Sequence, residues 1–94
     1  MFHINLLTYI MEILKTHQIV IYNDDEHSFQ YIMASLIKFC EHHPHQAEQC
    51  AMIAHNKGKC VVKSGEFNEI FEIHEKLNRL EIKSDIEDYA SDFY

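Results

Sequence analysis

Three consecutive oxygen-bearing side chains, Asn23, Asp24 and Asp25, separate a β-branched segment from a helical pattern of apolar residues. A junction of this kind presents its side chains at the surface on rigid supports. His55 lies near the end of a second predicted helix. The two ends could lie side by side. Their polar groups would then form one cluster next to apolar side chains, made of two carboxylates, an amide oxygen and an imidazole. Such a cluster suits a ligand that has an ammonium group attached to an apolar side chain. The alternative is a plain turn and a solvated histidine, since Asn and Asp are common turn residues.

Cysteines and histidines also gather in one segment, with the spacing Cys40-x-His42-x2-His45-x4-Cys50. Structural zinc sites favour closely spaced pairs on turns, whereas these cysteines occupy apolar helix positions, where a free cysteine acts as a small core residue. A zinc-binding module stays open as an alternative; it would unfold with a chelator. A nucleophile at Cys60 would need an oxyanion hole and an orienting group, and neither is visible. We expect no enzyme, no metal and no cofactor.

Periodic apolar residues divide the chain into the elements that position these groups. Residues 17–22 predict a strand, and residues 29–40 predict a helix capped by Ser28. Pro44 begins a second helix that Gly58 closes, and residues 59–63 predict another strand. Ser64 is expected to cap a third helix, and residues 82–86 alternate as a last strand. The core face of the third helix is expected to contain Phe67, Ile70, Phe71, His74 and Leu77.

The order is therefore β-α-α-β-α-β, preceded by a short helix over residues 3–15. Three short strands cannot bury both faces of a sheet alone. We expect an α+β fold in which a three-stranded antiparallel sheet is covered on one side by three helices. Residues 16–88 form the domain, residues 1–15 an apolar N-terminal segment, and residues 89–94 an acidic tail that frays.

The composition excludes several classes of protein. The chain has 94 residues, about one small domain, and its 15 acidic and 8 basic side chains give a net charge of -7, which opposes binding to nucleic acid. Three cysteines are an odd set for a secreted disulfide framework, so we expect a cytoplasmic protein. The apolar run near the N-terminus is shorter than the roughly 20 residues that span a bilayer, so we expect no membrane partner.

Four segments together resemble ClpS, the adaptor of the bacterial AAA+ Clp protease. They are the run from Ile19 that ends in Asn23-Asp24-Asp25, the sequence Leu36-Ile-Lys-Phe39, the sequence Gln46-Ala-Glu-Gln-Cys50, and the sequence Ala54-His55-Asn-Lys-Gly58-Lys59. The likeness covers about residues 16–88. It implies a monomeric adaptor that recognises N-degron proteins by a bulky hydrophobic first residue and delivers them to a ClpA-like unfoldase. Another interaction module, similar to a ribosome-stalk domain, is a second alternative beside the metal-binding module.

The resemblance also implies roles for particular residues. The α-amino group of the substrate would be held by Asn23, Asp24, Asp25 and His55. The hydrophobic pocket maps onto His27, Phe29, Ile32, Ala51, Ala54 and Ile82, and the unfoldase-facing surface onto Glu66. Ala51 stands where ClpS proteins often have a methionine that narrows the pocket. We therefore expect a wider mouth that admits Ile or Val in addition to Leu, Phe, Tyr and Trp, although Phe29 refills part of that space.

Overall fold

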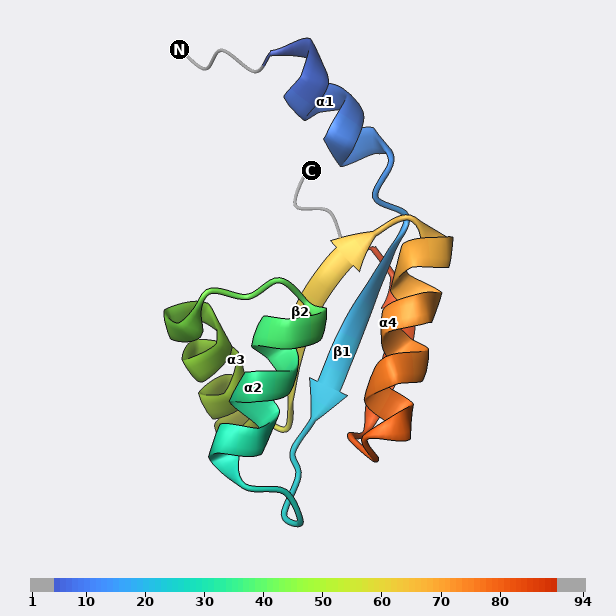
Figure 1. The fold of residues 1–94 in the computed structure, drawn as a ribbon. Helices are drawn as coiled ribbons and strands as arrows, with labels where there is room; N and C mark the ends of the chain where they lie inside the picture. Colours follow the sequence, from blue (N-terminus) through green and yellow to red (C-terminus); the bar gives the residue numbers. More distant parts are fainter. Residues whose placement is uncertain (1–4, 90–94) are drawn as a thin grey trace.

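The computed structural model describes residues 5–89, which form four helices and one sheet (Figure 1). The elements are α1 (Leu6–Ile13), β1 (His17–Tyr22), α2 (Phe29–Phe39), α3 (Pro44–Lys57), β2 (Lys59–Gly65), α4 (Phe67–Arg79) and β3 (Ser84–Asp88). The order from β1 onward is β-α-α-β-α-β, as predicted. The predicted beginning of the first helix at residues 3–4 and most of the predicted tail, residues 90–94, lie outside the described residues.

β1 is the central strand of the sheet, whose order is β2-β1-β3. Both neighbours are antiparallel to it: His17 pairs with Gly65 of β2, and Ile21 pairs with Ser84 of β3. In Figure 1, α2 and α3 lie side by side, while α4 runs along β1 and contacts β3. The predicted antiparallel sheet with three helices is therefore confirmed.

The apolar core lies between the sheet and helices α2, α3 and α4. Ile19 and Ile21, which alternate along β1, belong to it and are almost fully buried. α3 contributes a row of small residues to the core, which are Ala47, Cys50, Ala51 and Ala54. Small side chains let a helix approach its neighbours closely. By contrast, α1 extends away from this core in Figure 1, and its Leu6 and Leu7 are exposed.

A bulge in β2 explains a buried histidine. The register with β1 moves from Lys63 to Val61, which leaves Val62 as an extra residue. Val62 is 5% exposed and belongs to the core. A backbone carbonyl group in such a buried position needs a hydrogen-bond partner. The Nε2–H of His42, which is itself buried, donates to this carbonyl oxygen at 2.6 Å. His42 thus stabilises the bulge.

The start of α4 differs from the prediction. Ser64 does not cap this helix, because it lies within β2, where it pairs with Gln18. The N-cap is instead Glu66, two residues further along the chain, whose side chain accepts a hydrogen bond from the Glu69 amide at 2.8 Å. β2 continues through Ser64 instead of ending before it, because each added residue extends the ladder of hydrogen bonds with β1.

The buried face of α4 was also predicted incorrectly in part. Ile70, Ile73 and Leu77 are buried, whereas Phe67 and Phe71 are 45% and 46% exposed. The two phenylalanines lie on the adjacent stripe of the helix, with their ring centroids 5.8 Å apart. The Phe67 ring also contacts His17 at the start of β1.

Gly58 provides a test of the backbone at the end of α3. It has a φ of 96°, and a Cβ there would meet no atom within 4 Å, so the cost of an added side chain is one of backbone conformation alone. We expect Gly58→Ala to lower the free energy of unfolding by about 1–2 kcal/mol. Gly58→Asn should lose less, because asparagine tolerates the left-handed region. Thermal unfolding measures both, and equal stability of the two variants would contradict this account.

Candidate functional site

The turn between β1 and α2 is held together by the side chain of Asp24. Its Oδ1 accepts hydrogen bonds from the backbone amides of Glu26, at 2.8 Å, and His27, at 2.9 Å. Its Oδ2 forms an ion-pair contact with Nδ1 of the His27 imidazole. Ser28 then caps α2 by accepting from the Tyr31 amide. Asp24 therefore fixes the path of the chain from strand to helix.

The electrostatics of Asp24 follow from these bonds. Its side chain is only 8% exposed. Burial alone would raise the pKa of Asp24, but the hydrogen bonds from the His27 amide and imidazole and from the Glu26 amide outweigh burial and lower the pKa. The carboxylate is thus charged at neutral pH, and both of its oxygens already have partners inside the turn.

A backbone hydrogen bond joins this turn to the end of α3. The amide of Asn23 donates to the carbonyl oxygen of Gly58 at 2.9 Å. Gly58 closes α3 in the left-handed conformation, with its own amide donating to Ala54. His55 lies in the last turn of that helix. The bond therefore brings the Asn23 side of the turn next to the His55 side of α3, which is the arrangement that the hypothesis of a shared site requires.

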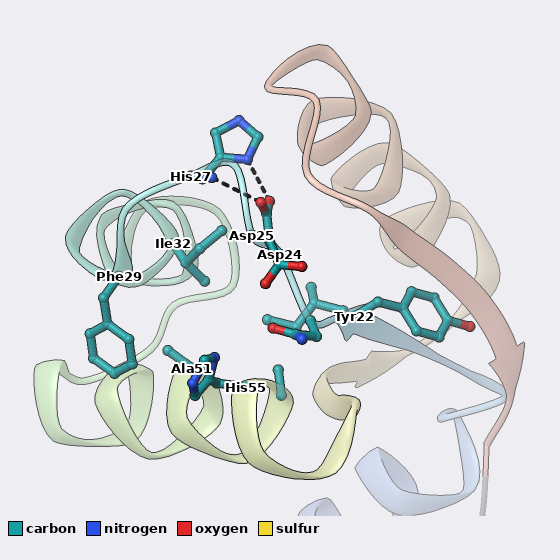
Figure 2. Close-up of a pocket in the computed structure, with 11 residues that line it drawn as sticks. Tyr22, Asp24, Asp25, His27, Phe29, Ile32, Ala51 and His55 are labelled. Carbon is teal, nitrogen blue, oxygen red and sulfur yellow. Dashed lines mark hydrogen bonds and ion pairs between the residues drawn. The ribbon is translucent and has the colours of Figure 1, made fainter.

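A cavity of about 310 Å³ opens where the turn, α2 and α3 meet. Its volume is at the lower end of the roughly 300–1,000 Å³ typical of small-molecule sites. Figure 2 shows Phe29 and Ile32 from α2 facing Ala51 on α3, with the turn residues on another side. The lining residues are Ile21, Tyr22, Asn23, Asp24, Asp25, His27, Phe29, Ile32, Ala51, Ala54 and His55.

The wall of this cavity is divided into an apolar base and a polar lip. Ile21, Ala51 and Ala54 are at most 5% exposed and form part of the base. Asn23, Asp25 and His55 are exposed. Within residues 5–89, the side chains of these three polar residues have no hydrogen-bond partner. The last turn of α3 adds the partial negative charge of a helix C-terminus, which favours a cation.

Most of the site residues expected from the sequence line this one cavity. They are Asn23, Asp24, Asp25, His27, Phe29, Ile32, Ala51, Ala54 and His55. Ile82 does not line it; this residue is 2% exposed and packs in the core just before β3. Glu66 lies elsewhere, at the start of α4.

Two lining residues were not predicted from the sequence, Ile21 and Tyr22, the last residues of β1. The signal for Ile21 was present, because its alternation with Ile19 points it toward the helices that form the cavity. Tyr22 gave no such signal. Its hydroxyl donates to Asp85 of β3 at 2.8 Å, which is a contact across strands that a single sequence does not reveal.

Cys40 and Cys60 lack the low pKa of a reactive cysteine. Burial raises the pKa of Cys40 to about 12. Burial, with a hydrogen bond to Cys50, raises the pKa of Cys60 to about 12. Both groups are therefore protonated at neutral pH, whereas the thiolate is the nucleophile. In the part of the chain that the structure describes, no three Cys, His, Asp or Glu side chains are grouped to hold a metal ion.

The described helices are all too short or too polar to cross a membrane.

The cavity is the feature of this domain with the clearest chemistry. An apolar recess with an adjoining set of hydrogen-bond acceptors and one unpaired carboxylate suits a cationic amine attached to an apolar side chain.

Comparison with known protein families gives an independent assignment. The family model described as ATP-dependent Clp protease adaptor protein ClpS matches residues 12–85. No curated protein matches the chain. The matched residues contain every element that lines the cavity, from the end of β1 to the last turn of α3. Adaptors of this family interact with the unfoldases of Clp proteases. The match confirms the resemblance seen in the sequence, and the chain belongs to the ClpS family of Clp protease adaptors.

Proposed function

We propose that this adaptor binds proteins by a free N-terminal α-amino group and a bulky hydrophobic first side chain, and that it delivers them to a ClpA-like Clp unfoldase. The observation that carries the proposal is the division of a single cavity into an apolar base and a lip of unpartnered acceptors. The first side chain enters the base, and the amino group meets the lip. The chain itself supplies recognition and no catalysis.

The number of acceptors matches the ligand. An α-amino group has an ordinary pKa of about 7.7–8.0, so it is mostly a cation with three N–H donors at pH 7. Asn23 offers an amide oxygen, Asp25 a carboxylate and His55 a ring nitrogen, and all three line the cavity. Asp24 lies in the same wall, but its oxygens are bonded within the turn. We therefore assign direct contact with the amine to Asn23, Asp25 and His55.

The energies support binding of a single residue. Charge-assisted hydrogen bonds contribute roughly 1.5–3 kcal/mol each, and burial of a Leu or Phe side chain contributes about 2–3 kcal/mol. Association costs about 4 kcal/mol or more. The balance corresponds to a dissociation constant around micromolar for a short peptide.

The first test changes only the amine of a short Leu-first peptide. N-acetylation removes both the charge and two of the donors, so we expect binding to be lost at peptide concentrations that saturate the free amine. N-methylation keeps the charge but replaces one donor by a methyl group, so we expect a loss of about tenfold, the lower end for a charge-assisted hydrogen bond. Calorimetric titration of the three peptides gives the dissociation constants.

A pair of charge-neutralising variants serves as the control for this test. Asp25→Asn should weaken binding of the free-amine peptide, because Asp25 lines the cavity. Asp88→Asn removes the same charge at the other end of the sheet, where Asp88 pairs with His17, and should leave binding unchanged. Equal affinity for free and acetylated peptides would refute the proposed function.

Another prediction concerns Ala51, whose side chain sets the width of the cavity. This residue is 5% exposed and faces Phe29 across the recess in Figure 2. We propose that its small side chain leaves room for β-branched first residues, which a longer side chain would exclude. Wild type is expected to bind Ile-first peptides nearly as well as Leu-first peptides, and Ala51→Met to lose mainly the Ile-first peptide. Equal binding of the Ile-first peptide by both proteins would defeat this explanation.

Delivery requires a second surface, and the start of α4 is the candidate. Glu66, Phe67 and Phe71 are exposed there, with the two rings beside each other. In the sheet, Gly65 pairs with His17 at the beginning of β1, while the turn that lines the cavity follows the end of β1. Six strand residues at about 3.3 Å each separate the two surfaces by roughly 20 Å. We propose that this surface contacts the unfoldase while the cavity is occupied.

A further prediction separates delivery from substrate binding. Phe71→Ser should greatly slow degradation of a Leu-first protein by the unfoldase and protease, with peptide affinity unchanged, because the ring lies far from the cavity. Ile37→Ser is the matched control, since Ile37 is also a partly exposed apolar residue, on α2. Degradation assays and peptide titrations should be run on both variants. Undiminished degradation with Phe71→Ser would exclude this surface.

A further inference from the structure

His27 stands at the edge of the cavity but is bonded away from it. Its Nδ1 contacts Oδ2 of Asp24, and Figure 2 shows one dashed line from the ring and one from the His27 amide to the Asp24 carboxylate, with the ring on the outer side of the turn. The ring also stacks on Tyr31, with centroids 4.7 Å apart and an interplanar angle of 11°. The side chain is 19% exposed. These contacts orient His27 toward the turn rather than toward the first residue of a substrate.

We infer that His27 is a positioning residue for recognition of the amino group, and not a residue that contacts the first side chain of the substrate. This inference rests on the proposed function. The imidazole donates to the oxygen of Asp24 that the backbone leaves without a partner, while the two backbone amides hold the other oxygen. Asp24 is thereby fixed from both sides, and the turn presents the next carboxylate, Asp25, at the lip.

The physical reason is preorganisation. A carboxylate held by two donors on one oxygen can still rotate, and a third donor on the second oxygen removes that freedom. Any freedom left in the turn must be given up when the amine binds, and this ordering weakens affinity. Stacking on Tyr31, whose hydroxyl donates to the carbonyl of Leu80 after α4, in turn holds the imidazole. The lip is thus supported by a chain of contacts from α4 to Asp24.

Two substitutions at residue 27 separate the donor from the ring. His27→Phe keeps an aromatic ring that can stack on Tyr31 but loses the N–H, whereas His27→Asn places an amide N–H close to the position of Nδ1 and loses the stacking. For free-amine peptides we expect His27→Phe to bind about three- to tenfold more weakly than wild type. His27→Asn should recover most of that loss. The ratio of Leu-first to Phe-first affinity should not change in either variant, because the base of the cavity is intact.

His74 offers a matched control. It too is a half-buried histidine whose Nδ1 forms a hydrogen bond, here with the Ser84 hydroxyl at 2.9 Å, and it does not line the cavity. His74→Phe should alter thermal stability but leave peptide affinity unchanged. If His27 had only a structural role, His27→Phe would behave in the same way.

Peptide titration of wild type and the three variants, with thermal unfolding of each, decides between the outcomes. Unchanged affinity with His27→Phe, or a changed Leu-to-Phe ratio, would overturn the inference while leaving the proposed function intact. Failure of wild type to bind any free-amine peptide would overturn the proposed function, and the inference with it. If His27→Phe does not fold, a reduced affinity of Tyr31→Leu that spares the Leu-to-Phe ratio supports the inference, and an undiminished affinity overturns it.

Discussion

The hydrogen bond between the Asn23 amide and the Gly58 carbonyl is the constraint on which the site depends. It links the end of the central strand to the end of α3, two points that are 35 positions apart in the chain. Gly58 can occupy this point because its φ of 96° is accessible to glycine without strain. The core beneath it, with the small residues of α3 against the sheet, keeps the two ends at this separation. The residues that line the cavity are therefore positioned by backbone hydrogen bonding and by packing of the core.

The three polar residues of the turn have different tasks, although their side chains are chemically similar. Asp24 is turned inward and satisfies two amides and an imidazole, so its charge stabilises the loop. Asn23 and Asp25 remain exposed at the lip. This division avoids a problem of charge, since two free carboxylates side by side would repel each other and favour protonation of one of them.

The sequence predicted the location of the site because its signals are local. Turn-forming Asn and Asp residues after a β-branched strand, and a glycine after a helix, mark element ends without reference to the rest of the fold. It could not show that Asp24 is bonded within the turn while Asp25 stays exposed, because the side chain that becomes buried depends on the donors the folded turn offers. Ile82 illustrates the same limit, since a buried residue in the core and one in a cavity wall have the same apolar pattern.

The start of α4 shows where competing local preferences are settled by tertiary structure. Ser64 is a good capping residue, but the ladder with β1 continues through it to Gly65, and Glu66 caps the helix instead. The stripe with Phe67 and Phe71 and the stripe with Ile70 and Ile73 fit the helical repeat equally well. Packing against the sheet buries the stripe with the two isoleucines, and the two phenylalanine rings are left at the surface.

The small volume of the cavity has a consequence for the range of cargo. Under the proposed function, a recess of about 310 Å³ encloses one large first side chain and little else, so the remainder of the bound polypeptide stays outside in solvent. An adaptor that binds only the first residue in this way would be indifferent to the length, shape and folded state of the rest of the polypeptide. A protein would become a client at the moment when a cut in its backbone exposes a suitable new terminus, without any change in its own conformation.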